Sequence, residues 1–232
     1  MRYFYSAIQK LIEFGYKRCD EGCRIYMFHQ VNDDRTRWQN PNVSISVQGF
    51  KKFIDSIIQN GERIYSVEQL EVVREGACIT FDDVYADACE YAIPYLVKKQ
   101  IPFCIFVTLD NVGKEGFISE SQLQWLKDEP LCTIGFHTNK HRMMRTLEQN
   151  EIIRELDQAG LEKLIGKRCE VFAFPYGSLW ACNRKSVQKV AHMNYKMAFS
   201  TIAIPCTDYW WGKHRFFLPR INVNEENYAK KV

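Results

Sequence analysis

Two acidic residues stand side by side at the end of an apolar run. The stretch Ala77 to Asp87 reads ACITFDDVYAD, so the run ends on Asp82 and Asp83. Successive side chains of a strand point to opposite faces, and a carboxylate near a core needs a partner for its charge. The pair therefore indicates either a solvated turn or helix cap, which aspartate forms well, or a site where the two acids face different partners.

Two histidines follow another apolar run at a spacing of four residues. CTIGF is followed by HTNKH, in which one helical turn would direct His137 and His141 to the same point. A lone histidine is more often a surface or hydrogen-bonded residue than a ligand. Two imidazoles and one carboxylate, with the remaining positions left to water, form the ligand set of a catalytic metal site. The aspartate pair after a separate apolar run strengthens this interpretation.

Strands and helices must alternate along the chain to bring these side chains together. Strands are expected at CRIYMFHQV, ACITF, FCIFVT, CTIGF, VFAF, KMAFS and FFLPRINV, and helices over residues 46–61, 86–100, 121–127, 147–164 and 183–192. Repeated strand-helix units imply a parallel sheet, and six to eight of them in one domain imply a barrel. The carboxyl ends of barrel strands carry the chemistry, and the polar clusters follow the predicted strands there.

Composition favours one α/β domain and argues against several classes of protein. The 232 residues are 46% hydrophobic, enough for one large core, and the net charge of +3 comes from intermixed charges without a basic block, so no nucleic-acid partner is expected. The nine scattered cysteines fit reduced thiols better than a disulfide framework. No signal peptide or membrane span is apparent, and we expect a cytoplasmic protein.

The first 22 residues form a segment of their own, ahead of a barrel domain over residues 23–232. Phe4, Ile8, Leu11 and Ile12 have the spacing of an amphipathic helix. Its basic residues are Arg2, Lys10, Lys17 and Arg18. Packing of this helix on the body is the more common outcome, and weak contact with an anionic membrane surface is the alternative.

Three ordered motifs together resemble a known family. TFDDV, HTNKH and FAFPYG, after YMFHQV, look like the motifs of the polysaccharide deacetylase family, carbohydrate esterase family 4 or NodB-homology domain. The resemblance covers roughly Arg24 to Val223. It implies a single-domain distorted (β/α)7-type barrel that removes acetyl groups from N-acetylated sugars with one divalent metal ion.

The resemblance also implies a role for each motif residue. Asp82 would be the general base, while Asp83, His137 and His141 would hold the metal. Tyr176, in FAFPYG, stands where the family offers a backbone N–H to the oxyanion. Zn²⁺ is the expected ion, with Co²⁺, Ni²⁺, Mn²⁺ and Fe²⁺ also compatible with such ligands.

The chain departs from the family pattern at three places. Val84 replaces the glycine of the first motif, and Ala173 stands where many members carry an arginine that orients the base. Some branches read FAYPYG there, so FAFPYG resembles a subfamily trait. The late motif that ends in the acid histidine is missing, and LPRINV holds Arg220 in that region. We therefore expect His29, near the end of the first strand, to act as the general acid.

The expected activity is metal-dependent hydrolysis of an N-acetyl group on a sugar, a glycan or a lipid-linked sugar intermediate. Two alternatives are a deformylase or other amide hydrolase, and a sugar-binding homologue without catalysis. Tyr209, Trp210 and Trp211 in CTDYWWGKHRFF are predicted to lie in a loop, where they would either stack on sugar rings or cover one end of the barrel.

Overall fold

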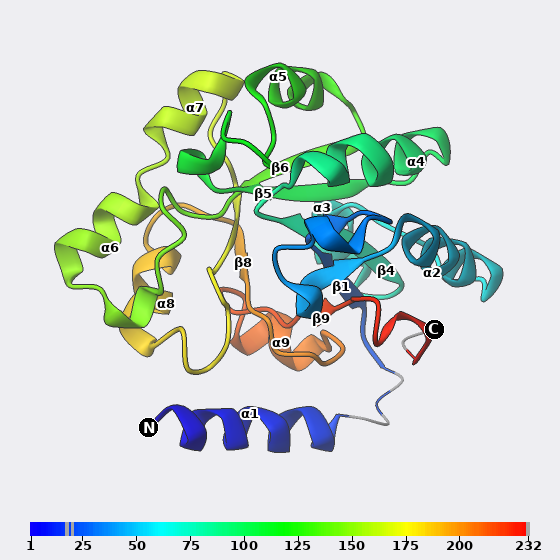
Figure 1. The fold of residues 1–232 in the computed structure, drawn as a ribbon. Coiled ribbons are helices and arrows are strands. Elements are labelled where there is room, and N and C mark those ends of the chain that lie inside the picture. The colour runs from blue at the N-terminus through cyan, green and yellow to red at the C-terminus, as the bar shows by residue number, and fades with distance from the viewer. Residues whose placement is uncertain (17–18, 20, 231–232) are drawn as a thin grey trace.

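Seven parallel strands build one curled sheet in the computed structural model, which describes residues 1–16, 19 and 21–230 (Figure 1). These seven strands are β1 (Arg24–Phe28), β4 (Ala77–Asp82), β5 (Phe103–Val107), β6 (Cys132–Phe136), β7 (Val171–Ala173), β8 (Met197–Phe199) and β9 (Ile221–Asn222). Two short strands, β2 (Gln30–Val31) and β3 (Ser44–Ile45), form a second sheet. The α-helices are α1 (Arg2–Gly15), α2 (Val47–Gln59), α3 (Val67–Val73), α4 (Ile93–Lys98), α5 (Glu120–Asp128), α6 (Gln149–Leu156), α7 (Ala159–Ile165), α8 (Arg184–Ala191) and α9 (Asp208–Lys213).

The order of the strands places the first and last strands of the barrel domain side by side at one end of the sheet. The large sheet runs β8-β7-β6-β5-β4-β1-β9, while β2 and β3 pair separately. Phe28 lies opposite Phe81, and Asp82 lies opposite Phe106, so the strands end together at one edge. The sheet curls into a half-barrel, and this confirms the single-domain α/β barrel expected from the sequence.

Local sequence explains where the helices begin and what they bury. Side chains of Ser46, Ser66, Ser119 and Asn183 accept hydrogen bonds from backbone N–H groups in the first turns of α2, α3, α5 and α8. The apolar face of α2 covers the sheet, where the Phe50 ring packs edge-on against Phe28 at 5.0 Å between centroids. Capping and apolar periodicity therefore agree on the same helices.

Three expected elements differ from the structure. Residues 147–164 form two helices, α6 and α7, because the backbone is extended at Asp157 and the next side chain, Gln158, bonds the backbone N–H and C=O of Cys169 at 2.7 and 3.2 Å. Helices α3 and α9 were not predicted. The prediction that Tyr209, Trp210 and Trp211 lie in a loop is wrong, because they lie in α9. The last strand is also shorter than predicted, with β9 limited to two residues.

Helix α1 lies outside the half-barrel and runs along its lower side in Figure 1. It has 14 residues, none of which is buried. Within the described ranges, no helix combines the length and apolar character needed to cross a membrane. Lys17 and Arg18 of the predicted basic set lie outside the described residues. The cytoplasmic location stays a prediction from the sequence.

Candidate metal centre and active site

A pocket of about 550 Å³ opens at the carboxyl edge of the sheet. The predicted site residues that line it are His29, Asp82, Asp83, His137, His141 and Tyr176. They come from the ends of β1, β4, β6 and β7, which the parallel sheet places at one edge with β5 between β4 and β6. The structure thus brings together all six residues that the sequence nominated from four separate motifs.

Asp83, His137 and His141 form the one cluster of three metal-ligand side chains found among the described residues. One donor atom from each lies within 4.8 Å of the other two. The Nε2 atoms of His141 and His137 lie 3.5 and 4.0 Å from Asp83 Oδ1. Two imidazoles and one carboxylate would leave the remaining coordination positions of a bound ion open, so this donor set fits a catalytic divalent ion.

Neighbouring groups fix the orientation of these ligands. His137 Nδ1 lies 2.7 Å from the carbonyl oxygen of Ala173, an arrangement that places the proton on Nδ1 and leaves the Nε2 lone pair toward Asp83. Burial lowers the pKa of His137 to about 4, more strongly than Asp82 raises it, so the ring stays neutral and able to ligate. Thr108 donates a hydrogen bond of 3.3 Å from Oγ1 to Asp83 Oδ1.

The two histidines meet without the helical turn predicted for HTNKH. Thr138 and His141 both adopt the left-handed backbone region, with φ of 71° and 55°, and the segment is a turn. Its shape is held by a 3.0 Å hydrogen bond from the His141 N–H to Thr138 Oγ1. The rings of His137 and His141 nevertheless lie 4.9 Å apart, because the turn returns the chain to the strand end.

A turn, more than strand alternation, also separates the two acids. Strand β4 ends at Asp82, and Asp83 and Val84 follow with φ of 61° and 52°. A β-branched residue rarely adopts this region, which explains why the first motif of the family has glycine where this chain has Val84. The turn leaves Asp82 facing inward and sends Asp83 to the histidines.

Arg220 is the residue whose role the sequence did not reveal. It is fully buried, and its Nη1 and Nη2 donate to Asp82 Oδ1 and Oδ2 at 2.7 and 2.6 Å. Its Nε also donates to the Ser200 carbonyl oxygen at 3.0 Å. Burial alone would raise the pKa of Asp82, but the Arg220 guanidinium and His137 lower it well below its usual range. Asp82 is therefore held in one orientation and ionised.

This pairing accounts for the missing third-motif arginine. Ala173 contributes only its backbone oxygen, to His137, while the guanidinium reaches Asp82 from the segment before β9. The usable signal was a charged residue inside the apolar run FFLPRINV, because a buried arginine requires a carboxylate or several acceptors. One sequence could not identify which carboxylate.

Comparison with known proteins agrees with this geometry. The family model described as "Polysaccharide deacetylase" matches residues 71–198, more than half of the chain. The chain belongs to the polysaccharide deacetylase family. Hydrolysis of N-acetyl groups on sugars is the activity that this membership supports in general. A search of the curated proteins found no match.

Solved structures of deacetylases share the fold. IcaB from Ammonifex degensii is 21% identical, with a TM-score of 0.73 over 91% of this chain and 95% of that chain. The deacetylase PplD from Streptococcus pyogenes, in complex with acetate, is 18% identical, with a TM-score of 0.76 over 90% and 97%. The de-N-acetylase from Aggregatibacter actinomycetemcomitans is 16% identical, with a TM-score of 0.73 over 90% and 98%. At these identities the likeness shows the fold.

Two further residues of the deacetylase pocket have unpaired polar atoms. His29 sits at the break between β1 and β2, and its Nδ1 is buried without a hydrogen-bond partner in the part of the chain that the structure describes. Burial also lowers the pKa of His29. The Tyr176 ring packs against His141 at 4.8 Å, and the backbone N–H of Tyr176 donates to no described group. The Tyr176 N–H is therefore free to meet a substrate, while His29 lines the pocket with its Nδ1 shielded from solvent.

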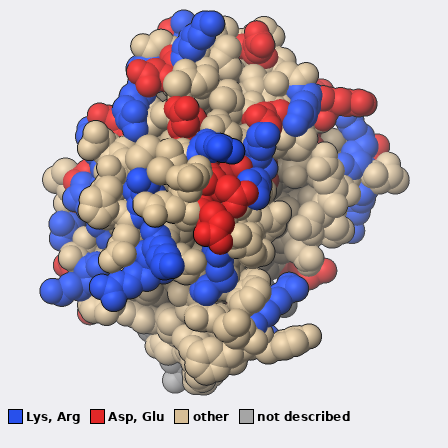
Figure 2. Space-filling view, turned by 90° about the vertical axis from the view of Figure 1, so that its left-hand side faces the viewer, with Lys and Arg blue, Asp and Glu red and all other residues tan. Residues whose placement is uncertain are grey.

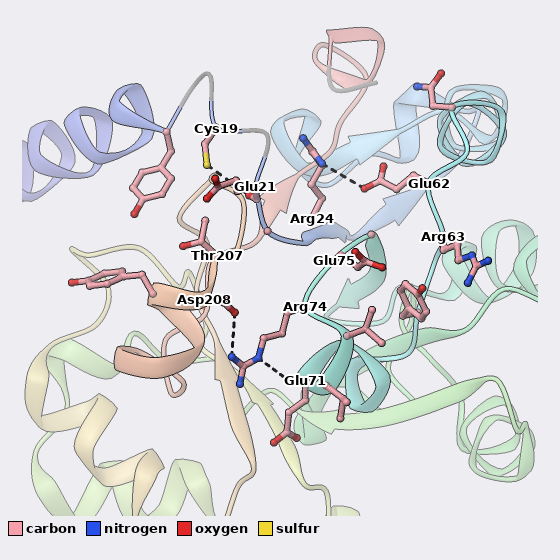
Figure 3. A pocket seen from close by; sticks show the side chains of 18 of the residues that line it. Cys19, Glu21, Arg24, Glu62, Arg63, Glu71, Arg74, Glu75, Thr207 and Asp208 are labelled. Atoms are coloured by element: carbon pink, nitrogen blue, oxygen red, sulfur yellow. Dashed lines mark hydrogen bonds and ion pairs between the residues drawn. The ribbon is translucent and has the colours of Figure 1, made fainter.

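The aromatic residues of α9 do not line this pocket. Trp210 and Trp211 are buried, which agrees with the interpretation that they cover the body, and Tyr209 borders a different crevice. That crevice, of about 1590 Å³, lies at the amino edge of β1 and β4 and is shown in Figure 3. Four of its charged side chains form two ion pairs, Arg74 with Asp208 at 3.1 Å and Arg24 with Glu62 at 3.7 Å.

Proposed function

We propose that this family member hydrolyses the N-acetyl group of a sugar in the carboxyl-edge pocket, with a divalent ion held by Asp83, His137 and His141. One observation carries the proposal: the three ligand side chains converge beside an ionised Asp82 that Arg220 holds by two hydrogen bonds. A ligand set and a positioned carboxylate are both needed for metal-assisted hydrolysis. A sugar-binding homologue without catalysis would not need the positioned carboxylate.

The ion would supply Lewis-acid polarisation of the amide carbonyl and lower the pKa of water, and Zn²⁺ suits this donor set. The protein's part is to place Asp82, which accepts the proton of the attacking water. Asp82 Oδ2 lies 3.8 Å from His137 Nε2, so the base borders the metal ligands without being one of them in this assignment. Because both of its oxygens are bound by Arg220, its reach into the pocket is fixed.

Tyr176 and His29 are assigned to the remaining steps. The free N–H of Tyr176 can donate to the oxygen on which negative charge develops as water adds to the carbonyl carbon. As the carbon–nitrogen bond breaks, the sugar nitrogen needs a proton, and His29 is the histidine of the pocket outside the ligand set. Acetate and a free amino sugar are the products.

The lining of the pocket is suited to a sugar. Amide side chains of Asn40, Asn42, Asn111 and Asn222 offer donors and acceptors for hydroxyl groups. Tyr85 and Phe117, also in the lining, stack on each other at 5.0 Å and present apolar surface. The Streptococcus pyogenes structure contains acetate, the acid that this reaction would release.

The test is a panel of N-acetylated and N-formylated sugar conjugates incubated with protein that has been loaded with Zn²⁺, Co²⁺ or Ni²⁺. We expect acetate release that a chelator abolishes and a returned metal restores. Formate release without acetate release would assign a deformylase instead. Absence of both acids with every metal, from protein shown to hold the ion, would contradict the proposal.

A further inference from the structure

Helix α1 is fastened to the loops that surround the pocket. Gln9 accepts a hydrogen bond from the Leu179 N–H at 3.1 Å and donates one to the Thr201 carbonyl oxygen at 3.4 Å. Glu13 accepts from the Ala203 N–H at 3.1 Å. The first of these loops carries Tyr176, and Thr201 itself lines the pocket. The position of α1 is therefore tied to the mouth of the proposed active site.

An aromatic and cationic contact adds to this attachment. The guanidinium carbon of Arg145 lies 4.4 Å from the centre of the Tyr5 ring and 5.5 Å from that of Trp180. Arg145 in turn donates to the carbonyl oxygens of Leu179 and Trp180 at 2.8 and 2.5 Å. One face of α1 thus has specific partners in the body, which a detached tail would not need.

The opposite face of α1 is apolar and exposed. Tyr3, Phe4, Leu11 and Phe14, here called the outer face, have exposed fractions of 89%, 65%, 71% and 74%. At 100° per residue these positions fall in one stripe, on the side away from Tyr5, Gln9 and Glu13. The single acid of α1 is Glu13, which faces the body, so the outer face carries no negative charge.

One basic side chain, Lys10, borders the outer face on the side of the pocket, whereas Arg2 lies farther round the helix, toward the body. Arg2 and Lys10 are exposed and line a crevice of about 440 Å³ between α1 and the loop after β7, and Tyr176 lines this crevice too. Figure 2, which views the molecule from the left of Figure 1, shows an uncharged lower end with Lys and Arg side chains above and beside it. An interfacial helix has this division, with apolar residues in the acyl region and cations at the headgroup phosphates.

We propose that the outer face of α1 inserts into an anionic lipid surface and holds the carboxyl-edge pocket against that surface. The charge pattern selects the occupant, because an apolar stripe that carries no acid and is bordered by Lys10 complements acyl chains below a layer of phosphates. If the proposed function holds, a lipid carrier would present the sugar from that surface.

A second copy of this chain is the other occupant to consider, and the outer face is too small for it. The outer face has four residues, whereas a stable protein–protein interface takes roughly 20–30 residues from each partner. A membrane has no such minimum, because each inserted side chain adds to the partition independently.

The experiment measures flotation of the full chain with vesicles of phosphatidylglycerol and phosphatidylcholine in equal parts. The wild type is compared with the triple variant Phe4→Ser, Leu11→Ser, Phe14→Ser, whose partition into the vesicle fraction should fall roughly tenfold or more. A matched control replaces three exposed apolar residues elsewhere, Ile58→Ser, Val72→Ser and Ile153→Ser, and should float as the wild type does. Lys10→Gln should weaken binding roughly fivefold at low salt, and Arg2→Gln, on the body-facing side of α1, should weaken it less.

Vesicle binding needs no turnover, so this test and the test of the proposed function fail separately. Circular dichroism should show all variants folded, since every replaced side chain is exposed. Flotation of the triple variant equal to that of the wild type would overturn the proposal, as would a wild type that does not float. If the wild type is a dimer, the triple variant is a monomer and neither binds vesicles, the outer face would be assigned to a second copy.

Discussion

The two edges of the sheet hold very different concave surfaces. The amino-edge crevice is the larger, about 1590 Å³ against about 550 Å³ for the carboxyl-edge pocket. Its ion pairs lie at the surface, Arg24 with Glu62 at 3.7 Å and Arg74 with Asp208 at 3.1 Å. At the carboxyl edge, one ion pair, Arg220 with Asp82, is fully inside, and polar atoms beside it lack partners.

This difference shows that size does not identify the functional site. Charges that neutralise one another at a surface have little left to offer a ligand, and exposed pairs contribute little to stability. Side chains that converge while leaving donors and acceptors open must obtain their partners from an ion or a substrate. The smaller pocket satisfies this condition with the cluster of Asp83, His137 and His141, and the described residues of the larger crevice form no such cluster.

Loss of a metal ligand at the carboxyl edge should have the largest effect on metal content and acetate release, compared with a substitution at the amino edge. His141→Ala or Asp83→Asn removes one of three donor groups, and we expect loss of bound metal and of all measurable acetate release. Elemental analysis of the purified proteins measures the metal directly. Asp208→Asn, which breaks a surface pair at the amino edge, is the matched control and should keep both. Equal metal in all these proteins would refute the ligand assignment.

Removal of Arg220 should be the next most damaging change. Arg220→Met leaves Asp82 buried without its cation, and breaking such a pair costs about 3–5 kcal/mol of unfolding free energy. Urea denaturation measures this cost. The double variant Arg220→Met with Asp82→Asn should regain part of the stability, because no uncompensated charge remains, yet stay inactive. If Arg220→Met alone is as stable as the wild type, the pair does not carry the energy assigned to it.

His29→Gln should keep the metal and lower turnover roughly a hundredfold, as expected when a general acid is removed. The loss should be greatest for substrates whose amine is a poor leaving group, and this dependence separates a proton donor from a residue that only shapes the pocket. Rates on an activated anilide and on an unactivated acetamido sugar provide the comparison. Wild-type turnover on the acetamido sugar would exclude His29 as the acid.

The smallest effect is expected at the amino edge. Arg74→Gln breaks the pair with Asp208, in which both side chains are exposed, so the free energy of unfolding should change by no more than about 1 kcal/mol. Acetate release should not change. A larger loss of either would mean that the amino-edge crevice has a role that its paired charges conceal.

Much of the fold and site could be predicted because the signals are local. Apolar runs such as FCIFV and CTIGF are too short for anything but buried strands, and the motifs at their ends place Asp82, Asp83 and His137 at one edge. The barrel followed from repetition of these units. Motif order was enough to nominate the ligands before any distance was known.

The remainder depends on contacts distant in the sequence. Arg220 meets Asp82 across 138 residues, so no spacing rule could pair them. Gln158 ends a helix by bonding Cys169, which overrides a continuous helical pattern. The left-handed turn at Asp83 and Val84 was likewise hidden, because aspartate tolerates this region but valine, a β-branched residue, rarely adopts it.

Comparison of Asp82→Asn with the wild type tests the central claim most directly, since it changes one oxygen to nitrogen beside an intact ligand set. The measurement is acetate release from an N-acetylated sugar, at equal metal content confirmed in the same samples. We predict that metal binding is retained and that release falls roughly a hundredfold or more, as expected for loss of a general base. Release at the wild-type rate from the metal-loaded variant would contradict the assignment of Asp82 and the mechanism built on it.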